Sequence, residues 1–121
     1  MQEVTLEKFG NIEKRLSAAR GPFRLFGLFL RVDSPERWDL LVAAPWLNKN
    51  PEDGLKQVVK EMKGDLNPEE MSSVSRVVVL KTTDEALNSL PESDSLTNTI
   101  EDCRFGRVFI RKAHILSRIP F

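Results

Sequence analysis

Residues 23–47 are the stretch that most constrains the fold. In residues 23–32 both alternating phases are largely apolar, which is typical of a strand buried on both faces and therefore interior to a sheet. Residues 33–37, Asp-Ser-Pro-Glu-Arg, have turn chemistry at hairpin length, and residues 38–46 alternate again. We expect a central antiparallel hairpin. Its second strand either ends at Pro45 or leaves Pro45 on a free side, because proline donates no ladder hydrogen bond.

Helix signals lie on both sides of this hairpin. Leu6, Phe9, Ile12 and Leu16 recur at three- and four-residue steps. This apolar stripe predicts an N-terminal helix. Thr5 is its predicted cap, and Gly21 followed by proline is its stop signal. Asn50 and Asn67, each followed by proline and acids, predict the starts of a middle helix and of a short helix.

The remaining strands are shorter or more irregular. Residues 77–80 predict a third strand buried on both sides, and residues 84–90 predict one or two helical turns. Residues 104–119 alternate as a closing strand with a bend or bulge near Arg111, Lys112 and His114. Alternatively, Gly106 joins residues 99–104 and 108–118 as a hairpin.

This order of elements predicts an α+β fold. We expect the 121 residues to form a single domain with one mixed or mainly antiparallel sheet. The sheet should have about four to five strands, with the N-terminal helix, the middle helix and the short helices packed on it.

Composition excludes several classes of protein. Eighteen basic and 18 acidic residues give a formal net charge of +0, so no global field attracts nucleic acid or an anionic membrane. The single cysteine excludes an intramolecular disulfide and fits a reducing compartment, and we expect a cytoplasmic protein. The N-terminus lacks the order of a signal peptide, and the longest apolar run, residues 40–44, is far too short for a membrane span.

Catalytic motifs find little support. Cys103 and His114 are the only residues of their types, and no glycine-rich or helix-starting element follows Cys103 to form an oxyanion hole. We expect a half-buried thiol and a histidine on a strand surface. The scattered glycines show no phosphate-binding spacing. We therefore predict no catalytic residue, no cofactor and no metal ligand, and the sequence favours a protein that is not an enzyme.

A metal-dependent nuclease would need several carboxylates and a lysine that converge beside strands. Asp33, Glu36, Asp39 and Lys81 are the available set. A hairpin places Asp33 and Glu36 at its tip, and the strands lack the acid-x-lysine triplet of nucleases. We expect turn and solvent-exposed charges here.

The charges near the C-terminus are unevenly ordered. Residues 82–102 carry acids and no lysine or arginine, whereas residues 103–121 carry basic residues and no acid. The basic residues are Arg104, Arg107, Arg111, Lys112 and Arg118. They could follow a phosphate backbone while Phe105 and Phe109 stack on bases. The alternative is that acidic loop and basic strand neutralise each other and the phenylalanines belong to the core.

Apolar residues at two element ends are candidates for an interface. Trp46 and Leu47 follow the proline that closes the second strand, and Phe121 is in the last position of the sequence. Aromatic residues are enriched at the centres of interfaces, although a tryptophan after a strand-ending proline more often covers a helix. If the closing strand is also a sheet edge, pairing with a copy of itself would form a dimer.

Three segments resemble a small uncharacterised bacterial protein family. They are residues 26–31 (FGLFLR), 38–47 (WDLLVAAPWL) and 75–80 (SRVVVL), and the resemblance covers residues 23–80 and the closing basic strand. It implies a bacterial, cytosolic protein and carries no assigned activity or site residue.

Three functional hypotheses follow. The first is a non-catalytic module that binds a protein partner or associates with itself. The second is nucleic-acid binding through the basic closing strand, helped by Arg24 and Arg31. The third is a nuclease-like enzyme that depends on a metal ion.

Overall fold

The protein has one five-stranded mixed sheet, as predicted. The structure, a computed structural model, describes residues 1–90 and 99–118. Its strands are β1 (Leu25–Arg31), β2 (Trp38–Ala43), β3 (Val74–Val79), β4 (Thr99–Phe105) and β5 (Val108–Arg118). Their order is β3-β2-β1-β5-β4, and β2 and β3 are parallel whereas the other neighbours are antiparallel. The helices are α1 (Glu3–Arg20), α2 (Pro45–Lys49), α3 (Pro51–Asp65), α4 (Pro68–Ser72) and the 3₁₀ helix η1 (Glu85–Ser89).

The predicted central hairpin is confirmed. β1 is the middle strand and pairs with β2 in a register that places Phe26 opposite Val42. β2 ends at Ala43, and Pro45 begins α2. Proline is suited to this position because the first N–H groups of a helix have no intrahelical acceptor. The second strand therefore ends before Pro45, and Pro45 does not lie on a free side of the strand.

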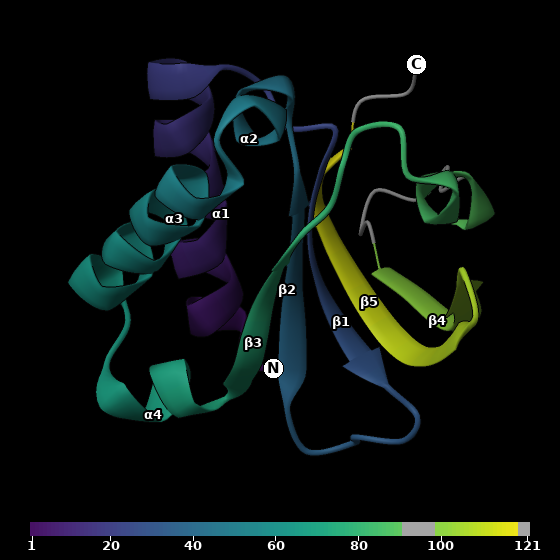
Figure 1. The fold of residues 1–121 in the computed structure, drawn as a ribbon. Helices are drawn as coiled ribbons and strands as arrows, with labels where there is room; N and C mark the ends of the chain where they lie inside the picture. The colour runs from purple at the N-terminus through teal and green to yellow at the C-terminus, as the bar shows by residue number, and fades with distance from the viewer. Residues whose placement is uncertain (91–98, 119–121) are drawn as a thin grey trace.

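Helices α1 and α3 cover one face of the sheet (Figure 1). The predicted stripe of α1 is buried there at Phe9, Ile12 and Leu16, and α3 adds Val58 and Met62. We call this apolar cluster the helix-side core. Its buried members are Phe9, Ile12, Leu16, Phe23, Phe26, Leu28, Trp38, Leu40, Val42, Ala44, Trp46, Leu47, Val58, Met62 and Leu66.

A second core fills the other face, on the side where η1 lies and where the β5–β4 end of the sheet curves round (Figure 1). We call it the opposite-side core. Its buried members are Leu25, Phe29, Leu41, Ala43, Leu87, Leu90, Ile100, Phe105, Ile110, Ala113 and Ile115. Successive side chains of a strand point to opposite faces, so β1 supplies Leu28 to one core and Phe29 to the other.

The C-terminal part forms the predicted hairpin alternative. β4 and β5 are antiparallel, and Gly106 in their turn has φ 61°, a conformation that glycine adopts without strain. A register shift between Leu30 and Arg31 leaves Arg111 as the additional residue of β5. The predicted bulge near Arg111 is therefore confirmed.

Two predictions about the elements were wrong. Thr5 is no cap, because α1 begins at Glu3 and the Thr5 hydroxyl instead donates to Glu70 Oε2 at 2.8 Å. β3 is not buried on both sides, because it is an edge strand whose residues are exposed or of intermediate burial. The sequence left open whether the closing strand is a sheet edge, and the structure places β5 between β1 and β4. Self-pairing through β5 is thereby excluded.

Candidate interaction surface at the edge of β3

The outer side of β3 has no neighbouring strand among the described residues. On its inner side, the Leu80 N–H donates to the Val42 carbonyl oxygen at 2.8 Å. Backbone groups alternate in direction along a strand, so Val78 also turns its N–H and C=O toward β2. Val77 and Val79 turn theirs outward. Backbone groups in this position need water or another chain as partner.

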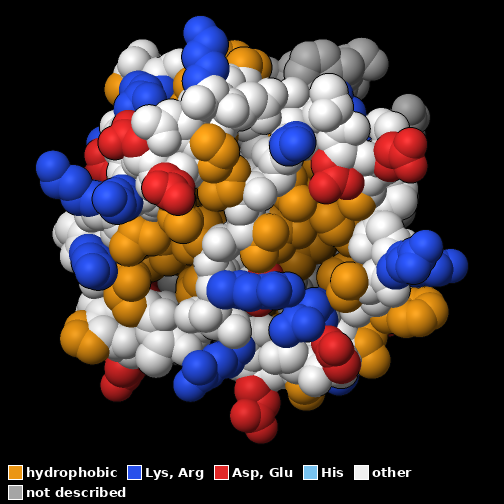
Figure 2. Space-filling view, viewed as in Figure 1, with side chains coloured by type: hydrophobic (Ala, Val, Ile, Leu, Met, Phe, Trp, Pro, Cys, Tyr) orange, Lys and Arg blue, Asp and Glu red, His pale blue; other side chains and the backbone are white. Residues whose placement is uncertain are grey.

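Apolar side chains line both faces of this edge. Val77 and Val79 pack against the helix-side core, and Val78 and Leu80 pack against the opposite-side core. All of them are only partly buried, because β3 has a strand on one side alone. Seen with β3 in front of β2, apolar side chains gather on either side of the strand (Figure 2). We call the outward backbone of Val77 and Val79, together with these side chains, the β3 edge.

The buried carboxylate of Asp39 forms an ion pair with Arg76, the positive charge next to this edge. Asp39 on β2 is 2% exposed, and its Oδ2 lies 3.0 Å from Arg31 Nε and 3.2 Å from a terminal nitrogen of Arg76. Two guanidinium groups offset part of the cost of burying one carboxylate. Arg76 is 55% exposed in its side chain and holds a positive charge directly before the apolar run. Charges in this position limit unspecific pairing of edge strands.

The regular part of the β3 edge is short. A register shift between Trp38 and Asp39 places Ser75 as an additional residue at the start of β3. From Arg76 to Val79 the pairing with β2 is regular. An irregular residue at the start of an edge strand restricts which register a further strand can adopt.

The predicted interface residues of α2 are packed inside the chain. Trp46 is 8% exposed and Leu47 is fully buried in the helix-side core. The indole N–H of Trp46 donates to the Gly21 carbonyl oxygen at 3.1 Å, and the Arg20 guanidinium lies 4.9 Å from the ring centroid. These two side chains therefore offer little surface to a partner. Phe121, the third predicted residue, lies outside the described residues.

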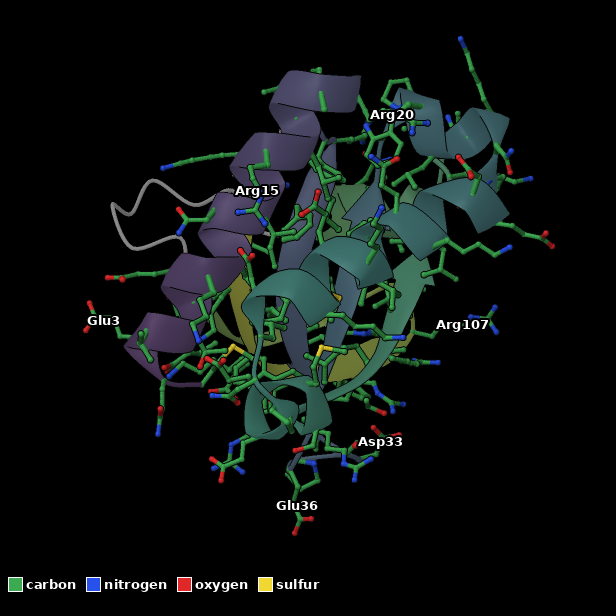
Figure 3. All side chains as sticks on the ribbon, turned by 90° about the vertical axis from the view of Figure 1, so that its left-hand side faces the viewer. Glu3, Arg15, Arg20, Asp33, Glu36 and Arg107 are labelled. Carbon is green, nitrogen blue, oxygen red and sulfur yellow. The ribbon has the colours of Figure 1, made fainter. Side chains whose placement is uncertain are left out.

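The structure separates the predicted nucleic-acid contacts into two groups. Arg104, Arg107 and Arg111 are exposed, and Arg107 extends away from the sheet (Figure 3). Lys112 is half-buried. The pKa of the Met1 amine is lowered mainly by the burial of that amine and to a smaller extent by the charge of Lys112. Arg118 is also half-buried and donates to the Leu90 carbonyl oxygen at 3.1 Å.

The two phenylalanines of this hairpin differ. Phe105 is 7% exposed and belongs to the opposite-side core, where its ring lies 5.2 Å from that of Phe29. Phe109 is 60% exposed, and the Arg104 guanidinium lies 5.2 Å from its ring centroid. Only Phe109 is thus accessible for stacking on a base.

Cys103 and His114 do not form a nucleophilic pair. In the β4–β5 ladder, His114 lies opposite Thr99, and Cys103 lies opposite Ile110. The His114 ring stacks on Trp38 at 5.1 Å, and its pKa is lowered by burial and by Lys112. Burial raises the pKa of the Cys103 thiol, which keeps it protonated at neutral pH.

The acids considered for a nuclease are scattered. Asp33 and Glu36 point in different directions at the tip of the β1–β2 hairpin (Figure 3). The Asp39 carboxylate is engaged by arginines on the sheet. Within the part of the chain that the structure describes, no group of three or more His, Cys, Asp and Glu residues could hold a metal ion.

No helix among the described residues has the length and apolar character needed to cross a membrane.

Comparison with protein-family models, with curated proteins and with solved structures gave no match. The resemblance to a bacterial family therefore stays a prediction, and the candidate site stands on its geometry.

Sequence reasoning missed the β3 edge, although one signal was present. Arg76 directly precedes the apolar run and Lys81 follows it. Flanking charges of this kind accompany edge strands, where they discourage aggregation. An interior strand of a parallel pair more often continues with apolar residues.

Proposed function

We propose that the chain is a non-catalytic protein-interaction module that docks another polypeptide strand along the β3 edge. One observation carries the proposal: among residues 1–90 and 99–118, no strand pairs with the outward backbone groups of Val77 and Val79, which lie between two rows of partly exposed apolar side chains. In strand addition, main-chain hydrogen bonds supply affinity, and side-chain contacts on both faces supply specificity. The β3 edge offers both.

Proline at position 77 tests this role. Val77→Pro removes an outward N–H and leaves the bonds between β3 and β2 in place, since proline is tolerated on the open side of an edge strand. Val77→Ala is the matched control, because it shortens the same side chain and keeps the N–H. The tagged wild-type chain and both variants are used to isolate binding proteins, and amide exchange is then followed by NMR with the purified partner.

The expected result is that wild type and Val77→Ala bind a polypeptide that slows exchange of the Val77 and Val79 amides, and that Val77→Pro does not. Circular dichroism verifies that all three chains are folded. A partner that protects other amides and binds Val77→Pro equally well would contradict the proposal.

The exposed pair of Arg104 and Phe109 supports a second candidate, nucleic-acid binding by the C-terminal hairpin. An aromatic face beside a cation suits single-stranded nucleic acid, because bases stack on the ring and phosphates attract the arginines. Binding should weaken steeply with salt as counterions are released. A mobility shift at low salt that is lost in Phe109→Ala supports this candidate, and no shift at low salt rejects it.

A further inference from the structure

We propose that the strand docked on β3 is the β3 of a second copy, in an antiparallel pair centred on Val78. The inference rests on the proposed function and names its partner. Two copies related by a two-fold axis present the same strand to each other in opposite directions. A sheet edge therefore pairs with itself without any further element.

The outward backbone groups select the register. With Val78 at the centre, Val77 lies opposite Val79 of the second copy, and Val79 opposite Val77. Both residues turn N–H and C=O outward, so each group meets its complement in a hydrogen-bonded pair. A centre at Val77 would instead place Val79 opposite Ser75, where the register of β3 is irregular. The Val78 centre uses only the regular part of the strand.

The side chains favour the same register. Val78 meets Val78 on the opposite-side face, and Val77 meets Val79 on the helix side, so valines contact valines on both faces. β-Branched pairs of this kind stabilise neighbouring strands. Arg76 lies opposite Leu80, which keeps the two Arg76 side chains apart and lets each keep its Asp39 partner. A centre at Arg76 would bring like charges directly opposite each other.

Global charge does not oppose the pairing. The formal net charge is +0, so two copies approach without net repulsion, and proteins near zero net charge associate more readily. The pair also covers the apolar rows on either side of β3 (Figure 2). A second copy thus matches the edge in backbone and side chains, and net charge does not oppose its approach.

Charge substitutions at the centre test both the partner and the register. Val78→Lys and Val78→Glu are each measured alone and as an equal mixture by light scattering coupled to size exclusion, from low micromolar to the highest soluble concentration. Wild type should have twice the monomer mass. Each variant alone should be a monomer, because like charges oppose each other at the two-fold axis, and the mixture should regain the dimer mass. Circular dichroism verifies the fold of each variant, and Phe109→Ala, outside the pairing, should remain a dimer.

The possible failures are distinguishable. A wild-type chain that stays monomeric, or a folded mixture that stays monomeric while wild type is dimeric, overturns the Val78-centred pair. If a different polypeptide then protects the Val77 and Val79 amides, the interaction role of the edge stands without self-pairing. If neither a second copy nor another polypeptide protects them, both proposals fail.

Discussion

Glu70 shows how one side chain ties the N-terminal helix to the connection before β3. Its carboxylate accepts hydrogen bonds from the Asn67 N–H at 3.0 Å, Lys8 Nζ at 2.7 Å and the Thr5 hydroxyl at 2.8 Å. Asn67 reciprocates by accepting from the Glu70 N–H, which completes a capping box at the start of α4. These donors, the Asn67 N–H foremost, lower the pKa of Glu70 from 4.5 to about 2.

The lowered pKa of Glu70 predicts a loss of stability in acid. A carboxyl whose pKa is lower in the folded state stabilises the fold above its unfolded pKa, and this contribution disappears as protons bind the folded form. The melting temperature should therefore fall between about pH 4.5 and 2 in part through Glu70. In Glu70→Gln that part of the fall should be absent, which thermal unfolding followed by circular dichroism across this range measures.

The neighbouring Glu69 supplies the control. Its side chain is exposed, and Glu69→Gln should follow the wild-type pH profile. If Glu70→Gln also followed that profile, the hydrogen bonds from the Asn67 N–H, Lys8 and Thr5 would not carry the expected stabilisation.

At the scale of the elements, Gly54 allows α3 to pack closely against α2. A Cβ atom at this position would overlap Leu47 Cδ2 and lie 3.4 Å from Trp46 Cζ3. Because Leu47 is fully buried, it cannot move away freely. Gly54→Ala should therefore lower the free energy of unfolding by about 1–3 kcal/mol, the usual cost of overpacking.

Gly10 in α1 is the matched position, because nothing lies within 4 Å of a Cβ built there. Gly10→Ala should raise the free energy of unfolding by about 0.5–1 kcal/mol through its better helix propensity. Urea denaturation of both variants measures the difference. Equal effects of the two substitutions would show that α2 and α3 are not in close contact.

The sequence predicted the helices and strands themselves better than it predicted which strands lie side by side in the sheet. The periodic stripe of α1, the two apolar phases of β1 and the Asn-Pro starts of α3 and α4 each indicated the observed element, because burial of one face leaves a local pattern. The edge position of β3 left no periodic pattern and was indicated only by the flanking charges Arg76 and Lys81. Its valines contact both cores, and the apolar pattern alone cannot distinguish this from enclosure between two strands. Strand order depends on where α3 returns the chain, which is a property of packing.

The candidate sites show the same limit. The exposed arginines of the β4–β5 hairpin could be named from charge order, yet Phe105 and Phe109 could not be told apart. The bulge at Arg111 changes which side chains of β5 share a face. For Trp46 the sequence offered both an interface role and a covering role, and the burial of its indole by the end of α1 depends on a contact between segments distant in sequence.

At the scale of the whole molecule, the two cores share the strands between them, and this predicts that they unfold together. Both tryptophans, Trp38 and Trp46, lie in the helix-side core, whereas Phe29 lies in the opposite-side core. Phe29→Ala should lower the free energy of unfolding by about 3–5 kcal/mol, as expected when a buried aromatic side chain is removed. Tryptophan fluorescence should report this loss although no tryptophan belongs to the damaged core.

The measurement is denaturation followed by fluorescence and by circular dichroism on the same samples. Their midpoints should fall by the same amount, since β1 cannot lose the packing of Phe29 on one face and keep that of Leu28 on the other. Phe109→Ala, at a side chain 60% exposed, should change stability by no more than about 0.5 kcal/mol. A fluorescence midpoint that stays at the wild-type value in Phe29→Ala while the circular dichroism midpoint falls would mean that the helix-side core is stable without the β4–β5 side of the sheet.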